Sequence, residues 1–192
     1  MSKFLLYVSS YILLLTSGII ILRFWVPRDY LNHGRLSPIT LFFQALLFFA
    51  YGGFPYFYLE KDWPAVSIPL FIQVAGGLLV FIGLIFLLYG MFRLGIARSL
   101  GSGKTQLEQS GIYSSSRNPQ ALACGFYVLG FFLLWPSWYA VGWAFLYFPL
   151  IHMMVITEEN HLRRKHGQKY QEYCEKTPRY FGRNTNQKRV SA

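Results

Sequence analysis

The sequence predicts an all-α membrane protein with about five transmembrane helices, ending in a helical hairpin that is followed by a cytosolic amphipathic helix. Three observations lead to this fold class. The chain of 192 residues is 54% hydrophobic and only 14% charged, which is too apolar for a soluble domain of this size. Uncharged runs long enough to cross a bilayer, about 20 residues, recur along it. The longest uncharged stretch, Gln120 to Ile156, is long enough for two passes.

The N-terminal half contains three uncharged runs that predict the first three spans. They are Phe4 to Leu22, Ile39 to Leu59 and Val66 to Phe92. The first run is longer than the core of a signal peptide and lacks a small-residue cleavage site, so we expect an uncleaved helix. Between the first two spans, Arg23 to Ser37 is expected to form a basic loop that sets orientation.

The third span carries glycines at intervals of about seven residues, at Gly76-Gly77, Gly83 and Gly90. Small residues on one face of a helix let a neighbouring helix approach closely in lipid. This face is therefore expected to pack tightly against another span, a structural role that implies no chemistry.

The stretch from Gln120 to Ile156 predicts a hairpin. It has 37 residues and no formally charged side chain when His152 is neutral. A single helix of that length would extend about 55 Å, well beyond the hydrocarbon core. Trp135-Pro136-Ser137-Trp138 supplies a turn and interfacial aromatic rings, which leaves a short first arm of about sixteen residues.

From Glu158 onward the chain is polar and predicts an amphipathic helix. Four positions recur at intervals of three or four residues, while most charged side chains fall elsewhere around the helix. These positions are Leu162, His166, Tyr170 and Tyr173. The last residues, Asn184 to Ala192, are expected to form a disordered basic end.

The net charge of +10 is distributed unevenly. With five spans, the two basic loops and the C-terminal part share one side and carry 16 of the 18 Lys and Arg, leaving Lys3 and Lys61 on the other. Because positive charge is retained in the cytoplasm, the C-terminus is expected there and the N-terminus outside. Either a bacterial inner membrane or an endoplasmic reticulum is compatible with this multi-pass topology.

The position of the basic residues also bears on partners. They lie beside predicted spans, which suits anionic lipid headgroups and not nucleic acid. No His or Cys spacing resembles a zinc site, so no metal is expected. The segment LGSGKT, Leu100 to Thr105, does not complete a phosphate-binding loop, because Arg98 stands where the first Gly is required; a Gly/Ser turn is the better interpretation.

Two polar blocks flank the predicted hairpin, which returns both to the cytoplasmic side. The first is GIYSSSRNPQALACG (Gly111 to Gly125), and the second is EENHLRRKHGQKYQEYCEKTPRYF (Glu158 to Phe181). Their order resembles isoprenylcysteine carboxyl methyltransferases and phospholipid N-methyltransferases, a family of integral membrane methyltransferases. The chain departs from the family pattern at Asn118, where His is usual, and at Ala121, where Tyr is usual.

The resemblance implies an S-adenosylmethionine-dependent methyltransferase. Its acceptor would be lipid-like or prenylated and reached from the bilayer, methylated either on an isoprenylcysteine carboxylate or on a phospholipid amine. It implies one integral membrane domain, 1–192, with transmembrane helices over 1–92, a cofactor-binding region over 93–183 and a tail over 184–192. Since no G-x-G-x-x-G follows a soluble strand, helix ends and the polar tail would build the cofactor site, and not a Rossmann fold.

Under this resemblance, the cofactor site comprises matched positions of both blocks: Tyr113, Arg117, Asn118, Pro119, Glu158, Glu159, His166 and Tyr170. The helix start at Asn118-Pro119 would present free N–H groups to an anion, and Arg117 would add a cation. One glutamate is expected to face inward, with Glu159 favoured. Asn-Pro is also an ordinary helix start, and acidic residues near a helix start are favourable without any function.

The catalytic candidates are Glu159 and Arg179. Arg179 is expected to orient an anionic acceptor, or alternatively to contact lipid headgroups. His152 either hydrogen-bonds between helices or lines the substrate cavity. An ammonium or hydroxyl acceptor would need a base, and no residue stands out as one, which favours a carboxylate or an already nucleophilic acceptor.

Two other hypotheses remain open at this point. A membrane NADPH-dependent reductase of the sterol-reductase type would bind a dinucleotide in place of S-adenosylmethionine. A non-enzymatic membrane scaffold with a degenerate site would bind neither, and the departures at Asn118 and Ala121 are the features that support it.

Overall fold

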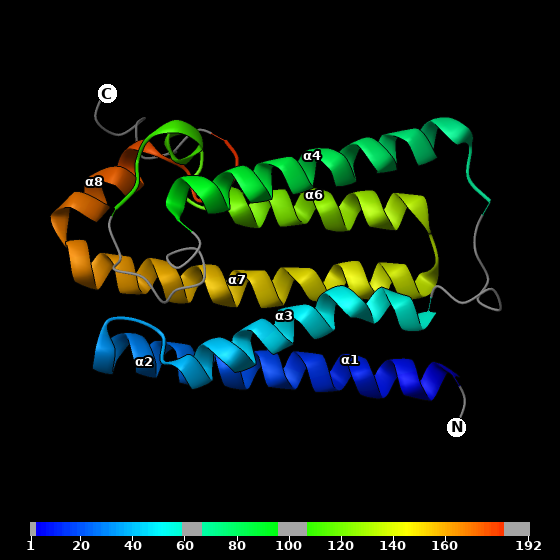
Figure 1. Cartoon of the computed structure of the whole chain (residues 1–192), viewed down its shortest axis with the longest axis horizontal. Coiled ribbons are helices and arrows are strands. Elements are labelled where there is room, and N and C mark those ends of the chain that lie inside the picture. Colours follow the sequence, from blue (N-terminus) through cyan, green and yellow to red (C-terminus); the bar gives the residue numbers. More distant parts are fainter. Residues whose placement is uncertain (1–2, 59–66, 96–106, 183–192) are drawn as a thin grey trace, which may run out of the picture.

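The structure, a computed structural model, describes residues 3–58, 67–95 and 107–182, and the regular elements in these ranges are helical (Figure 1). They are α1 (Lys3–Ile20), the π-helical turn η1 (Ile21–Trp25), α2 (Val26–His33), α3 (Pro38–Tyr58), α4 (Leu70–Leu94), the 3-10 turn η2 (Gly111–Ser114), α6 (Pro119–Leu134), α7 (Trp138–His166) and α8 (Gln168–Lys176). The all-α fold class is confirmed. The segment 100–105, Lys61 and the tail 184–192 lie outside the described residues.

Four helical runs within the described ranges are long and apolar enough to cross a membrane: Lys3–His33, Pro38–Pro55, Leu70–Leu94 and Trp138–His166. The helix α6 is shorter, with 16 residues, as the sequence predicted for the first arm of the hairpin. Many large apolar side chains are exposed on the outer surface, among them Phe49 at 80% and Phe92 at 73%. Apolar surface of this extent is what a lipid-facing protein presents. The chain is an integral membrane protein.

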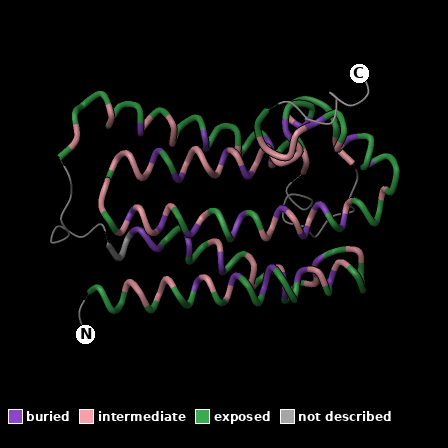
Figure 2. Tube along the Cα trace, turned by 180° about the vertical axis from the view of Figure 1, so that it is seen from behind, coloured by how far each residue is buried: buried purple, intermediate pink, exposed green. Residues whose placement is uncertain are grey.

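The helix α7 lies at the centre of the molecule. The helices α1 and α3 pack on one side of it, and α6, paired with α4, lies on the other (Figure 1). Figure 2 shows buried residues along the whole length of α7, whereas α4 is largely exposed. The core is centred on Trp143 and Leu146. Trp143 Nε1 donates to the Tyr51 carbonyl at 3.0 Å and the Tyr51 hydroxyl donates back to the Trp143 carbonyl at 3.3 Å, which satisfies two polar side chains in an apolar core.

The glycine face of α4 packs against α6, as the sequence predicted. A Cβ atom on Gly83 would lie 2.7 Å from the Ala123 carbonyl oxygen, and one on Gly76 would lie 2.9 Å from the Gly130 carbonyl oxygen. Gly77, one residue along, has nothing within 4 Å of such an atom. The two backbones therefore approach closely along one face only, and this contact sets the position of α6 beside α4.

The expected loop between the first two spans is mostly helix, so that prediction was wrong. The first helix continues through η1 into α2 and ends at Gly34, whose φ of +66° suits glycine. The π-helical turn leaves a backbone carbonyl of Leu22 available, and the Thr157 hydroxyl of α7 donates to it at 3.0 Å. The stacking of Tyr30 on His161, at 4.1 Å between ring centroids, also holds α2 against α7. Basic residues beside a span do not by themselves end a helix.

The polar segment that follows the hairpin also differs from expectation. It is not a separate amphipathic helix beginning at Glu158, because α7 continues without a break to His166. The chain turns at Gly167, with φ +53° and ψ −124°, a conformation that favours glycine. The short α8 follows; its Tyr170 and Tyr173 are buried, and the Tyr173 hydroxyl contacts η2.

Candidate active site

The two polar blocks meet at the N-terminal end of α6. The residues after α8 run back across this end, where the Arg117 backbone N–H donates to the Pro178 carbonyl at 3.0 Å. The Ser116 hydroxyl donates to the Arg179 carbonyl at 3.2 Å, and the Tyr173 hydroxyl donates to the Tyr113 carbonyl at 2.6 Å. The hairpin therefore does bring both blocks to the same end of the molecule, and α8 holds them together.

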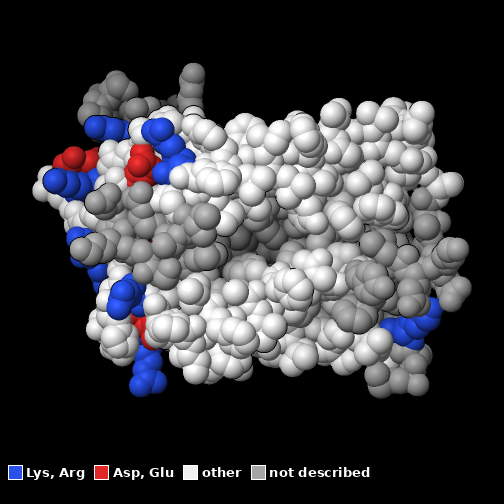
Figure 3. Space-filling view, viewed as in Figure 1, with Lys and Arg blue, Asp and Glu red and all other residues white. Residues whose placement is uncertain are grey.

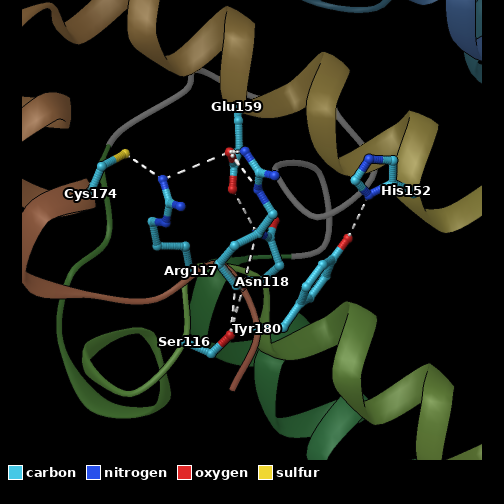
Figure 4. Close-up of polar contacts among 8 residues, drawn as sticks. Ser116, Arg117, Asn118, His152, Glu159, Cys174 and Tyr180 are labelled. Carbon is cyan, nitrogen blue, oxygen red and sulfur yellow. Dashed lines mark hydrogen bonds and ion pairs between the residues drawn. The ribbon is translucent and has the colours of Figure 1, made fainter. Parts of the chain in front are cut away.

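Glu159 is the centre of this contact. It is 3% exposed, and its Oε2 accepts hydrogen bonds from Arg179 Nε at 3.0 Å and Nη2 at 2.9 Å (Figure 4). Its Oε1 accepts from Asn118 Nδ2 at 3.0 Å. The guanidinium of Arg117 lies 3.7 Å away and also donates to the Cys174 sulfur. One buried carboxylate thus joins both polar blocks through charge-assisted hydrogen bonds, which are the strong ones.

The pairing with Glu159 accounts for the state of Arg179. Its hydrogen bonds to the carboxylate raise the pKa of the Arg179 guanidinium above its ordinary value, so the side chain stays charged. Its charge is already compensated by Glu159. Arg179 therefore acts first as a structural partner, and an anionic acceptor would have to compete with a buried carboxylate for it.

Asn118, which stands where the family pattern usually has His, links three segments of the chain. It stands at the start of α6, before Pro119, as an ordinary N-cap would. Its side chain makes no capping bond; the amide instead donates to Glu159 and to the Arg179 carbonyl, the latter at 3.2 Å. The side chain therefore connects α6, α7 and the C-terminal segment, and its amide group, with two donors, is well suited to this.

A small pocket of about 70 Å³ lies beside this cluster. Six of the residues expected to bind cofactor line it: Tyr113, Arg117, Asn118, Pro119, Glu158 and Tyr170. Glu159 does not line the pocket but holds Arg117 and Asn118, which do. His166 is not in its wall and lies, half-buried, in the last turn of α7.

Two buried polar atoms near this pocket lack a hydrogen bond of ordinary geometry within the described chain: Arg117 Nε, and the Tyr170 hydroxyl, whose side-chain neighbour is the weakly bonding Cys174 thiol. Tyr170 is only 1% exposed, and the Arg117 side chain 10%. Burial raises the pKa of the Tyr170 phenol, so it remains a neutral donor. Leaving a buried donor unsatisfied costs about 1 to 3 kcal/mol. A polar ligand in this pocket would recover that energy.

A second, apolar cavity of about 790 Å³ lies between α6 and α7. Its wall includes Phe126, Phe132 and Phe148, and within the described residues it contains no Lys, Arg, Asp or Glu. We call it the apolar groove. Ala121 lines both the groove and the polar pocket, so the two cavities share a wall at the first turn of α6.

A family model described as phospholipid methyltransferase matches residues 71–169, just over half of the chain. The chain belongs to the phospholipid methyltransferase family. The resemblance drawn from the two polar blocks is thereby confirmed. No curated protein and no solved structure matches the chain.

The matched region of this phospholipid methyltransferase family member contains most of the site. It begins in α4 and ends in α8, so it includes the glycine contact, Arg117, Asn118 and both glutamates. Arg179 and Tyr180 lie beyond it, yet they contact Glu159 and His152 within it. Across the described residues, no group of three or more His, Cys, Asp or Glu is arranged to hold a metal ion.

From the sequence, His152 had two alternative roles, and Tyr180 was expected only to pack the C-terminal segment onto the core. In the structure both line the apolar groove, with Tyr180 Oη 3.5 Å from His152 Nδ1 (Figure 4). A histidine within an otherwise uncharged stretch of 37 residues was a signal for His152. Nothing in the local sequence indicated Tyr180, because the two residues meet only after the chain has folded back.

Proposed function

We propose that the protein transfers a methyl group from S-adenosylmethionine to the amine of a membrane phospholipid. The main observation behind this proposal is that Ala121 lines both the polar pocket and the apolar groove, so the two cavities share a wall there. A polar cofactor and a lipid acceptor would meet there at the N-terminal end of α6. Membership of the family supports methyltransferase chemistry in preference to the reductase hypothesis.

The residues of the polar pocket fit the cofactor chemically. Arg117, with an unused Nε donor, and the start of α6 suit its carboxylate. Glu158 suits its ammonium or ribose hydroxyls, and the Tyr170 hydroxyl is a further donor. At about 70 Å³ the pocket is smaller than the roughly 300 to 1,000 Å³ of most ligand sites, so the lining has to move apart on binding. When bound, the cofactor supplies a methyl group already activated by a sulfonium.

The charges favour an amine over a carboxylate as the acceptor. The described lining of the groove carries no cation, and Arg179 beside it is engaged by Glu159. A carboxylate in an apolar groove without a cation would carry a large desolvation penalty. A phospholipid amine becomes neutral once its proton is removed, so it can enter the reaction uncharged.

Calorimetric titration of S-adenosylmethionine into detergent-purified protein tests the proposal. Wild-type protein is expected to bind saturably. Tyr170→Phe is expected to weaken binding between about twofold and tenfold, the value of one hydrogen bond, with little loss of stability, since the hydroxyl's side-chain neighbour, the Cys174 thiol, is a weak hydrogen-bonding partner.

Tyr7→Phe is the matched control. It also removes one hydroxyl, which donates to the Tyr139 carbonyl at 2.8 Å, near the α6–α7 turn. It should lower stability and leave cofactor affinity unchanged. Binding of NADPH but not S-adenosylmethionine would overturn the proposal in favour of a reductase, and binding of neither would favour a scaffold. Transfer of a labelled methyl group into phospholipid then identifies the acceptor.

A further inference from the structure

The apolar groove ends in a polar pair. His152 projects from α7 and Tyr180 from the segment after α8, and Figure 4 shows the two rings pointing toward one another. Tyr180 Oη lies 3.5 Å from His152 Nδ1. Tyr180 directly follows Arg179, so the pair also lies next to the cluster around Glu159. A lipid chain in the groove would therefore place its headgroup between the apolar wall and this polar end.

The groups that face His152 are few. Within the described residues that line the groove, the other titratable groups are Tyr180 and Tyr147. The Cys124 thiol of α6 interacts electrostatically with Tyr147. Tyr180 in turn interacts electrostatically with the ion pair of Arg179 and Glu159. Of these groups, an imidazole is the one that ordinarily gains and loses a proton near neutral pH.

We propose that His152 accepts the proton that the acceptor amine must lose, with Tyr180 as the positioning residue. This inference rests on the proposed function and names a base for it. In the tautomer whose Nδ1–H donates to the Tyr180 oxygen, Nε2 retains its lone pair and is free to take a proton.

The proton balance shows why a base is required. A phospholipid ammonium has no lone pair, so it has to give its proton to His152 before it can act as a nucleophile. The freed lone pair then forms the N–C bond while the C–S bond of the sulfonium breaks, its electron pair remaining on sulfur. The methylated amine carries a new positive charge, and the imidazolium releases its proton to water. A methylated nitrogen that still bears a proton can be methylated again, and each further methylation requires the same proton transfer to His152.

The test measures initial rates against pH for protein in nanodiscs that contain phosphatidylethanolamine, with saturating S-adenosylmethionine. For wild-type protein, kcat should rise with pH, because only an unprotonated imidazole can accept the proton of the acceptor ammonium. His152→Gln should lower kcat by about 100-fold or more, as expected for loss of a general base, with a small change in KM for the lipid. Added imidazole should partly restore His152→Ala.

Two controls separate a chemical role from a structural one. His33→Gln, at the exposed end of α2, should retain the wild-type rate and pH profile. His152→Gln should still bind S-adenosylmethionine by calorimetry with wild-type affinity, which also shows that it is folded. Tyr180→Phe should shift the pH profile and lower kcat less than the His152 variants do.

A further readout needs no turnover. In cofactor-free protein labelled on its four histidines, the NMR resonance that disappears in His152→Gln should shift when phosphatidylethanolamine is added. Phosphatidylcholine, whose nitrogen carries no proton, should shift it less. A wild-type protein that methylates phosphatidylethanolamine while His152→Gln keeps its rate and pH profile would overturn this inference alone. Failure of the wild-type protein to bind S-adenosylmethionine would overturn the proposed function instead.

Discussion

Glu159 links three parts of the chain that are far apart in sequence. Its two oxygens accept hydrogen bonds from Asn118 at the start of α6 and from Arg179 near the end of the described chain. Neutralising this residue would leave the guanidiniums of Arg117 and Arg179 facing an amide. Because Glu159 is buried, water could not fully replace its charge as a partner for these two guanidinium groups.

Glu159→Gln is therefore expected to lower the free energy of unfolding by about 2 kcal/mol, the scale of hydrogen bonds to charged groups, and to weaken S-adenosylmethionine binding through the displacement of Arg117. Denaturation of the detergent-solubilised protein, followed by circular dichroism, measures the first effect. Glu172→Gln, an exposed glutamate on α8, serves as the control and should stay within about 0.5 kcal/mol of wild type. Equal stability of the two variants would contradict the central role of Glu159.

The contact between α4 and α6 lies outside the candidate site, but it sets the position of α6, whose first turn lines both cavities. The first turn of α6 carries Ala121, which lines both cavities, and the glycine face of α4 fixes how closely that helix can approach. In the proposed cofactor site, the backbone N–H groups at the start of α6 move only with the helix itself. We therefore expect packing between α4 and α6 to affect methyl transfer.

Gly83→Ala tests this coupling. Its Cβ would lie 2.7 Å from the Ala123 carbonyl oxygen and 2.8 Å from the Tyr127 backbone nitrogen, so the two helices have to separate. We expect a loss of about 1 to 3 kcal/mol in stability and a lower rate of methyl transfer. Gly77→Ala adds the same methyl group where nothing lies within 4 Å, and alanine's better helix propensity should leave it as stable as wild type or slightly more so. Identical behaviour of the two variants would show that the contact does not matter.

The charged side chains give the molecule a polarity along its long axis. Figure 3 shows Lys, Arg, Asp and Glu concentrated around the ends of α2, α7 and α8, with a largely uncharged surface between them and the opposite end. The basic residues there include Arg163, Arg164 and Lys165 in the last turn of α7. The positive-inside rule predicts that this end faces the cytoplasm.

Labelling of introduced cysteines with a membrane-impermeant maleimide checks this orientation. In intact cells, Trp138→Cys at the α6–α7 turn, where the native side chain is 86% exposed, should react. Gln171→Cys on the exposed side of α8 should react only after the membrane is opened. Wild-type protein gives the background from Cys124 and Cys174, both partly buried. The reverse pattern would invert the topology.

Much of the fold followed from local properties of the chain. The apolar runs of α3 and α4, the short α6 and the turn before Trp138 lay where hydropathy and proline indicated, because burial in lipid depends on residues that are close in sequence. Helix ends were less predictable. The first helix continues beyond Leu22 and α7 continues beyond Ile156, since α2 and the end of α7 pack on each other and a polar residue can extend a helix that a neighbour supports.

The sequence established an all-α membrane protein with two polar blocks returned to one end, and six of the eight residues it proposed for cofactor binding line the polar pocket. The folded structure alone decided that Glu159 pairs with Arg179, that Asn118 joins them without capping its helix, and that His152 and Tyr180 end an apolar groove. Hydropathy and motif spacing are properties of neighbouring residues. A hydrogen bond between side chains 20 to 41 positions apart depends on how the helices between them pack, and no local pattern encodes that geometry.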